Sequence, residues 1–374
     1  MKTNATTPIP QGYKSTPLGI IPQEWEVRRL GEISVSISSG KNKYRDREGQ
    51  YPVYGSTGII GFSSEFRYEG VSILVARVGA NAGILNLVSG KYDVSDNTLV
   101  VIAKSNLYDY YFAYNQLVYC NLNRLVFGSG QPLITSNQLK NITIPVPPLA
   151  EQKKIAEVLG VWDRAIEKQS QLIEQLTLRK RGLMQQLLTA KRRLPGFSDP
   201  WKKVRLEEIC LIKRGNPLSS TQIRDGIYPV IAGGKTSPYF HDEYTDENVI
   251  TISASGAYAG FVSLHEDKIW ASDCSVISSR DGLSVLKYIY YLLALKQIYI
   301  YSLQVGGAQP HVLPIDIAKM KIYVPAKAEQ TAIAQVLTAA DREIELAQQK
   351  LELLRQQKRG LMQQLLTGKK RVKL

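Results

Sequence analysis

A tandem repeat constrains the fold of this chain more than any other feature of its sequence. The segment Trp25–Ile33 returns 176 residues later as Trp201–Ile209. Four shorter islands also return, namely Tyr51-Pro-Val53 at 228–230, Gly79-Ala-Asn-Ala-Gly83 at 256–260, Ser95-Asp96 at 272–273, and Gln131-Pro132 at 309–310. Because the spacing drifts only from 176 to 178 residues, both halves are expected to share one fold.

The similarity between the halves is uneven. Residues 151–189 and 329–367 are identical at 23 of 39 positions, and the sequence 181–189 recurs letter for letter at 359–367. The residues before each of these segments match only in the short islands. Two halves that keep one frame but differ in the side chains between the islands are typical of a scaffold that presents two different surfaces.

The two near-identical segments are predicted to be long helices. Pro147, Pro148 and Pro325 stand just before them, and Glu151 and Glu329 fall in the expected first turns. Apolar residues follow at the 3–4 spacing of a coiled-coil seam. The seam positions are Leu159, Trp162, Ile166, Ile173, Leu176, Leu183 and Leu187 in the first copy and Leu337, Ala340, Ile344, Ala347, Leu351, Leu354, Leu361 and Leu365 in the second. Each helix would be about 60 Å long.

We expect the two helices to pair antiparallel. The connector 190–200 reaches at most about 36 Å, too short to carry the chain back along a parallel helix. Lys180 and Lys358 fall on the seam at the same place in each copy. Each either extends its ammonium group to water or sets the register of the pair. A heptad inserted after Ala165 is expected to lie opposite one inserted after Ala347 or nearby.

The remaining sequence predicts two mixed domains, so we assign an α+β fold class. Val71–Ala76, Thr98–Ile102 and Asn248–Ile252 are predicted strands, and 108–119 and 286–301 are predicted helices. The expected organisation is an N-terminal tail (1–16), domain 1 (17–148), helix 1 (149–192), domain 2 (193–326), helix 2 (327–368) and a basic C-terminal tail (369–374).

Charge and cysteine content narrow the class of protein. The formal net charge of +14 favours nucleic acid or an anionic membrane surface as a partner. The longest apolar stretch, Leu283–Leu303, is interrupted by Lys287 and Lys296, so a buried helix is expected instead of a membrane span. Cys120, Cys210 and Cys274 lack metal-ligand spacing and are expected to be free thiols of a cytoplasmic protein.

No motif in the sequence supports catalysis or a bound cofactor. The three histidines, His241, His265 and His311, all lie in the second half, which excludes a histidine site common to both halves. Phosphate-binding and dinucleotide-binding glycine loops are missing, as is the Asn-Pro-Pro-aromatic tetrapeptide with which adenine methyltransferases hold a flipped base. We therefore expect no catalytic residue, metal site or cofactor in this chain.

Taken together, these segments resemble the specificity subunit of type I restriction–modification systems. The resemblance rests on the tryptophan-led segments, the Gly-Ala-x-Ala-Gly and Gln-Pro islands, and the helix start Pro147–Gln152. It extends through Asp163-Arg164 and the Arg-Gly-Leu-Met-Gln-Gln-Leu-Leu ending, and covers residues 17–368. The second copy departs from the first where Ala326 and Lys327 replace Pro148 and Leu149.

The resemblance implies a non-catalytic, DNA-reading role. In that family two target-recognition domains each read one half of a bipartite site in double-stranded DNA, and the paired helices act as a spacer. The helices also dock two methyltransferase subunits, which restriction–translocase subunits join. The methyl donor, ATP and magnesium belong to those partners.

Candidate DNA-contacting residues lie in loops at equivalent places of the two halves, where cations, amides and backbone groups are close together. They are Lys41, Lys43, Tyr44, Tyr54, Ser56, Arg77, Asn81, Ser129 and Gln131 in the first half, and Lys213, Arg214, Asn216, Lys235, Ser255, Tyr258, Gln309 and His311 in the second. A solvated turn remains the alternative for each single residue. The basic runs 191–193 and 369–373 are expected to be solubilising or loosely phosphate-binding.

Two other classes of function stay open at this point. One is a coiled-coil adaptor without sequence-specific DNA binding, and the other is a self-sufficient methyltransferase or nuclease. Neither explains why the helices are near-copies while the domains diverge.

Overall fold

The computed structural model describes residues 9–43, 49–127, 133–234 and 239–373. The chain forms two compact units, of which unit 1 comprises Met1–Gln169 with Lys350–Leu374, and unit 2 comprises Ser170–Gln349. Each long helix is therefore shared between the units. Mixed helices and sheets in both units confirm the α+β fold class.

Most elements of the two units correspond and follow the same order, as the repeat predicts, but within the described part of the chain the β1–β2 hairpin occurs only in unit 1 and α4 only in unit 2. Unit 1 contains β1 (Tyr13–Thr16), β2 (Gly19–Pro22), β3 (Glu26–Arg29), β4 (Ser34–Ser39), β5 (Tyr51–Gly55), β6 (Gly58–Ser63), β7 (Tyr68–Glu69), β8 (Ser72–Ala76), η1 (Gly79–Asn81), β9 (Leu85–Val88), β10 (Lys91–Val94), β11 (Thr98–Ala103), α1 (Tyr110–Tyr119), η2 (Leu122–Leu125), α2 (Ser136–Lys140) and β12 (Thr143–Val146). Unit 2 contains β13 (Lys202–Arg205), α4 (Leu206–Ile209), β14 (Cys210–Arg214), η3 (Ser220–Gln222), β15 (Tyr228–Ile231), β16 (Phe240–His241), β17 (Val249–Ser253), β18 (Val262–His265), β19 (Trp270–Ala271), β20 (Cys274–Ser279), α5 (Leu286–Leu295), α6 (Gln297–Tyr301), α7 (Pro314–Ala318) and β21 (Lys321–Val324). The long helices are α3 (Leu149–Leu187) and α8 (Lys327–Leu365).

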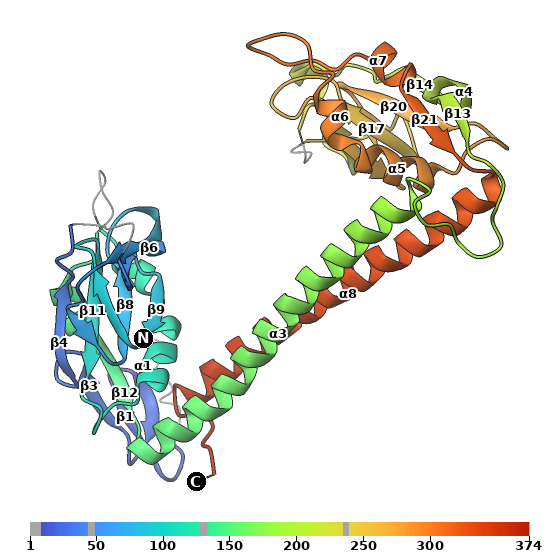
Figure 1. The fold of residues 1–374 in the computed structure, drawn as a ribbon. Helices are drawn as coiled ribbons and strands as arrows, with labels where there is room; N and C mark the ends of the chain where they lie inside the picture. Colours follow the sequence, from blue (N-terminus) through green and yellow to red (C-terminus); the bar gives the residue numbers. More distant parts are fainter. Residues whose placement is uncertain (1–8, 44–48, 128–132, 235–238, 374) are drawn as a thin grey trace. The chain divides into compact units, whose positions relative to one another are not determined.

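An antiparallel four-stranded sheet forms the centre of each domain. Its strand order is β4-β11-β8-β9 in unit 1 and β14-β20-β17-β18 in unit 2. Helix α1 packs on β8 and β9, and α5 packs on β17 and β18 (Figure 1). All five residues of β8 and of β17 are buried, because these strands are covered on both faces. Along β8, Ile73 and Val75 enter the main core, while Leu74 enters a second, smaller one.

A smaller sheet covers the other face of this sheet and contains a parallel pair in both units. In unit 1, β10 pairs parallel with β5, which continues antiparallel into β6. In unit 2, β19 pairs parallel with β15, which continues antiparallel into β16. Sequence reasoning did not predict this sheet, because its parallel partners lie far apart in the chain.

The ends of both long helices are built into the domain cores. In unit 1 the main core contains Ile155 and Leu159 from the start of α3 together with Met362 and Leu365 from the end of α8. In unit 2 the start of α8 and the end of α3 enter the core in the same way. Every predicted seam position of both helices is buried or half-buried. Each domain is therefore continuous with the helix ends that it contacts.

The two helices run antiparallel within each unit, because the start of one helix and the end of the other share a core, and ion pairs between the helices give the register. Lys358 Nζ lies 2.6 Å from Asp163 Oδ1 in unit 1, and Lys180 pairs with Asp341 in unit 2. Both seam lysines, at 13% and 21% side-chain exposure, thus contact a carboxylate of the facing helix and not open water. The role of these lysines in setting the register stays a prediction.

The same ion pairs correct the predicted matching of insertions. Two residues beyond Asp163 along α3 correspond to two residues before Lys358 along α8, because the helices are antiparallel. Ala165 therefore lies opposite Gln356. The position near Ala347 is about nine residues away from the facing one, because the sequence predicts antiparallel pairing but does not give the register.

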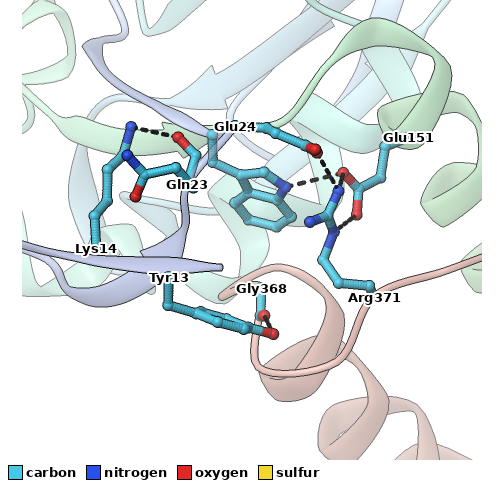
Figure 2. A network of polar contacts seen from close by, with 8 residues as sticks. Tyr13, Lys14, Gln23, Glu24, Glu151, Gly368 and Arg371 are labelled. Carbon is cyan, nitrogen blue, oxygen red and sulfur yellow. Dashed lines mark hydrogen bonds and ion pairs between the residues drawn. The ribbon is translucent and has the colours of Figure 1, made fainter. Parts of the chain in front are cut away.

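A buried glutamate at the start of one long helix binds two distant segments in each unit. One is the tryptophan at the beginning of the domain, and the other is the arginine just after the end of the facing long helix. Glu151, at 1% side-chain exposure, accepts the indole N–H of Trp25 at 2.9 Å and two bonds from Arg371 at 2.5 and 2.9 Å (Figure 2). Arg371 also donates to Glu24 at 2.8 Å. These hydrogen bonds to Glu151 and Glu24 raise the pKa of the guanidinium of Arg371.

Unit 2 repeats this arrangement with corresponding residues. Glu329, at 2% exposure, accepts two bonds from Arg193 at 2.5 and 2.7 Å and one from the indole of Trp201 at 3.2 Å. We call these two clusters the carboxylate clasps. After each long helix, one residue in the left-handed conformation turns the chain toward the arginine of the clasp. This residue is Ala190 (φ 57°) after α3 and Gly368 (φ 72°) after α8. A Cβ at Gly368 would lie 2.3 Å from Pro22 Cδ, which requires glycine there.

The clasps correct the interpretation of the two basic runs. Arg193 and Arg371 were expected to be solubilising or loosely phosphate-binding, and both instead neutralise a buried carboxylate. The prediction failed because a buried acid far away in the sequence cannot be identified as the partner from local composition. In both runs the bonds to the buried carboxylate come from the arginine.

The three cysteines agree with the expectation from sequence, whereas the single buried helix expected over 286–301 is divided into two helices at Lys296. Cys120, Cys210 and Cys274 are unpaired thiols, and burial raises the pKa of Cys210 to about 11 and that of Cys274 to about 12. The apolar stretch folds into α5 and α6. Within the described residues, no helix is long and apolar enough to cross a membrane.

We predict that Arg371→Ala destabilises unit 1 by about 3 kcal/mol, because it leaves the Glu151 carboxylate buried without its cation. Hydrogen exchange of residues 22–30 in the full chain measures this effect locally, and residues 198–206 of unit 2 serve as the internal reference. Lys370→Ala is the matched control, since it removes a neighbouring charge of the same run. Equal exchange in Arg371→Ala and Lys370→Ala would contradict the clasp.

Candidate nucleic-acid interface

One turn of unit 1 brings several of the predicted loops together. Residues 95–97 connect β10 to β11, and Asp96 and Asn97 are exposed. Three of the predicted loops bond to this turn or to the residue before it, through Ser95 N to Tyr54 O at 2.9 Å, Ser56 Oγ to Asn97 O at 2.9 Å, Arg77 N to Asn97 O at 3.0 Å, and Asn42 N to Val94 O at 2.9 Å. We call this turn the hub of unit 1. The loops that carry Lys41, Tyr54, Ser56 and Arg77 are therefore neighbours.

The hub of unit 2 is the corresponding segment 272–273. The corresponding backbone bonds join the same three kinds of loop to this segment or to the residue before it, through Asn216 N to Ala271 O at 2.8 Å, Ser272 N to Ile231 O at 2.8 Å, and Ala254 N to Asp273 O at 3.1 Å. The Ser255 hydroxyl donates to the Asp273 carboxylate. The repeated Ser-Asp dipeptide was visible in the sequence but was not predicted to be part of the site. Its return in both halves was the available signal.

The Gly-Ala-x-Ala-Gly islands form tight turns that present one variable side chain. Ala82 and Ala259 are buried at 3% and 0% exposure, whereas Asn81 is half-buried and Tyr258 is exposed. Gly83 (φ 94°) donates its N–H to Ala76 O at 2.8 Å, and Gly260 (φ 90°) donates to Ser253 O at 2.7 Å. The glycines and alanines thus serve the turn, and the central residue is free to differ between the units.

The Gln309-Pro310 island of unit 2 lies beside the turn of that unit. In unit 2, Gly256 N donates to Pro310 O at 3.1 Å, and the backbone of His311 pairs with Ser255 and Val305. Gln309 and His311 are both exposed. In unit 1, Leu133 pairs in the same way with Val78 and Phe127. The predicted residues Ser129 and Gln131 of this loop, as well as Tyr44 and Lys235 of other loops, lie outside the described residues.

The candidate cations differ in how freely they could meet phosphate. Lys41, Lys43 and Arg214 are exposed. Lys213 Nζ lies 2.6 Å from Asp246, whose side chain is 8% exposed, so part of its charge is neutralised within the domain. Arg77 is half-buried, with one nitrogen 3.4 Å from Asp96 O and a buried Nε that has no hydrogen-bond partner among the described residues.

Some predicted residues contribute through backbone or ring packing. The backbone carbonyl of Asn216 accepts a hydrogen bond from the Trp270 indole N–H at 3.0 Å, and Asn216 itself is exposed. The ring of Tyr54 packs edge-on against Tyr92, which stacks on Tyr68. Burial raises the pKa of Tyr92 and of Tyr68, so both phenols stay neutral beneath the Tyr54 loop. This aromatic cluster gives the hub of unit 1 a firm base.

The two sites thus share a backbone frame and differ in chemistry. Arg77 in unit 1 corresponds to the buried Ala254 in unit 2, and Asn81 corresponds to Tyr258. Exposed amides, hydroxyls and cations on such a frame can donate and accept hydrogen bonds at base edges and phosphates. Fold and site therefore define a class of protein with two similar but non-identical polar surfaces on one repeated frame.

Comparison with known proteins assigns the family. The model of the type I restriction modification DNA specificity domain matches residues 22–178 and again residues 198–356. The chain belongs to this family of type I restriction–modification specificity subunits, as the sequence resemblance suggested.

Individual relatives are similar along nearly their whole length. The MjaVIII specificity subunit of Methanocaldococcus jannaschii is 27% identical over 94% of this chain and 94% of its own. The MjaX specificity subunit of the same organism, itself putative, is 26% identical over 97% of both chains. The S subunit of M. genitalium shares the fold, with a TM-score of 0.66 at 19% identity over 91% of this chain and 96% of that chain.

We predict that Gly83→Ala costs at least about 2 kcal/mol of stability, whereas Gly79→Ala costs about 1 kcal/mol. Both glycines have positive φ, but a Cβ on Gly83 would lie 2.3 Å from Asn123 Oδ1 and one on Gly79 would meet nothing within 4 Å. Urea denaturation of the two variants measures the difference. Equal losses would show that the turn around Asn81 does not depend on this close approach.

Proposed function

We propose that this chain supplies the DNA address of a type I restriction–modification complex, each domain reading one half of a bipartite site in double-stranded DNA. The proposal is supported above all by the two hubs. They join corresponding loops by corresponding backbone bonds and present different side chains. Two such surfaces suit two different half-sites, because base identity is read by side-chain hydrogen bonds while the frame sets position.

Charge supports DNA as the ligand. The net charge of +14 favours association with phosphates, and Lys41, Lys43 and Arg214 are exposed close to the hubs. In this proposal these cations contribute sequence-independent affinity. Asn81, Arg77, Tyr258, Gln309 and His311 are the candidates for base contacts.

We further propose that the paired helices set the half-site spacing and dock two methyltransferase subunits. Helices α3 and α8 have equal lengths of 39 residues. Their outer faces carry exposed apolar residues, which favour contact with another protein. These residues are Val161, Leu172 and Leu178 on α3 and Leu346 and Leu353 on α8. Restriction–translocase subunits would join the same complex.

In this proposal catalysis belongs to the partner subunits. Two of the three histidines, His241 and His265, have local roles. His241 is buried and bonds to backbone groups of Gln222 and Glu243, and His265 bonds to Thr251 at 2.9 Å. Burial lowers the pKa of His265, so that its ring is neutral near pH 7.

Exchange of one domain tests the half-site assignment. Replacing residues 17–148 by the corresponding domain of a relative should change one half-site and leave the other unchanged. Mapping of methylated adenines after treatment of DNA with chain plus methyltransferase subunits gives the readout. The chain alone, without those subunits, is the control and should leave DNA unmethylated and uncut. A simultaneous change of both half-sites would contradict the assignment, and turnover by the chain alone would contradict the non-catalytic role.

Matched insertions test the helices as a spacer. One heptad after Ala165 together with one after Arg355 keeps the seam paired, because these positions face each other in unit 1. Each helix gains about 10 Å, or about three base pairs at 3.4 Å each. We predict methylation of the same two half-sites at correspondingly wider spacing. A single heptad in α3 is the mismatched control and should lose stability. An unchanged spacing preference in the doubly extended, folded protein would leave the helices as docking surfaces only.

A further inference from the structure

A three-residue node in each unit ties the domain to both long helices. In unit 1, Asp163 of α3 accepts a hydrogen bond from the Tyr111 hydroxyl of α1 on Oδ2 at 2.6 Å. Its other oxygen, Oδ1, accepts from Lys358 of α8 at 2.6 Å. One carboxylate thus holds a domain helix on one side and the facing long helix on the other.

Unit 2 contains the same node with the same division of oxygens. The Tyr291 hydroxyl of α5 donates to Asp341 Oδ2 at 2.7 Å, and Lys180 of α3 pairs with Oδ1. The Lys180 ammonium also lies over the Tyr291 ring, 5.3 Å from its centroid. Burial, followed by the bond to the aspartate, raises the pKa of Tyr111, and burial likewise raises that of Tyr291. Both phenols therefore remain protonated donors at neutral pH.

The two tyrosines do not occupy corresponding positions in the repeat. Gln152 bonds to Leu107 O and Asp109 N, and Gln330 bonds to Leu283 O and Val285 N, so α1 and α5 align with a shift of 176 residues. By that alignment Tyr111 corresponds to Lys287, and Tyr291 corresponds to Asn115. The donor comes from positions one helical turn apart, yet it reaches the same carboxylate oxygen.

Common descent of the two halves does not explain a bond made from two different positions. The two units therefore make the same bond to the same carboxylate oxygen by different means. Lys287 pairs with Glu266 at 2.8 Å, and Asn115 donates to Tyr111 O at 2.9 Å, so each replaced position has taken a local role.

The node supplies a second point of attachment between domain and helix. The first is Gln152 or Gln330 at the helix start, whose side chain bonds to the residues before α1 or α5. Asp163 and Asp341 lie eleven residues further along, about 16 Å away. One attachment alone would allow the domain to swivel about the helix start, whereas two fix its angle. The lysine adds the facing helix to the same fixed point.

We propose that Tyr111, Asp163 and Lys358, and equally Tyr291, Asp341 and Lys180, are positioning residues that fix each domain on the helix pair and so sharpen the half-site spacing that the protein accepts. This inference rests on the proposed reading of a bipartite site. It concerns the angle of each domain and is separate from the identity of the bases read. Two domains held at fixed angles accept one separation of the two half-sites, because separations that differ by one base pair differ in both the distance and the rotation between the half-sites.

The test uses the full chain with its methyltransferase subunits and DNAs that carry both half-sites at varied separation. The half-sites are first mapped from methylation by the wild-type complex. Tyr111→Phe and Tyr291→Phe remove only the hydroxyl and retain the ring. We expect the ratio of methylation at the preferred spacing to that at one base pair more or less to fall by roughly tenfold, as for loss of a hydrogen bond to a charged group. The identity of both half-sites should stay unchanged.

Matched controls separate positioning from stability. Tyr110→Phe removes a comparable bond, to Ala103 O at 3.1 Å, from the same helix without touching α3. It should lower the melting temperature slightly and leave the spacing profile unchanged. Asp163→Asn should broaden the profile as well, and adding Tyr111→Phe to it should broaden it little further, since both act through one bond.

The outcomes distinguish the inference from the proposed function. A profile of unchanged width in both tyrosine variants, with only stability or total rate reduced, would overturn the positioning role. A wild-type complex that methylates without any preferred spacing would overturn the proposed bipartite reading and this inference with it. Broadening in Tyr111→Phe and Tyr291→Phe but not in Tyr110→Phe supports the node.

Discussion

The buried carboxylates of Glu151 and Glu329 are the interactions on which the rest of the structure depends. A carboxylate removed from water must find a cation and hydrogen-bond donors, or the fold loses several kcal/mol. Here the donors come from a tryptophan at the domain entry and from an arginine just beyond the end of the facing helix. Each clasp therefore brings three distant segments to one point and fixes where the domain meets both helices.

The repeated islands form a constant frame around variable reading surfaces. Tryptophan, Glu-Gln and the glycine–alanine turns bond to backbone or to buried partners, so they cannot change without loss of stability. Asn81 and Tyr258 join the frame through their backbone carbonyls, which accept turn hydrogen bonds, and their side chains differ between the units. This division explains how one scaffold can keep its shape while its two halves acquire different chemistry.

Much of the fold could be predicted from the sequence, and less of the site. The repeat, the long helices and their antiparallel pairing follow from periodicity and from the short connector. The central strands 71–76 and 98–102 were predicted within a residue of β8 and β11. The parallel pair of β5 and β10 was not, because parallel partners lie far apart in the chain. The candidate loops were found through the islands, yet their convergence on residues 95–97 and 272–273 depends on backbone bonds that leave no mark on composition.

By itself the sequence determined the number of domains, the helix pair and the family, since repeats and heptads are local patterns. Only the tertiary structure decided which charged residues serve the fold. In the sequence, four of these residues cannot be distinguished from solvated cations: Arg193, Arg371, Lys180 and Lys358. In the structure each forms an ion pair with an acid more than a hundred residues away. Tyr111 and Tyr291 reach corresponding aspartates from positions that no alignment of the repeats would pair. The reason is physical: a salt bridge depends on proximity in space, and proximity between distant segments exists only once the chain has folded.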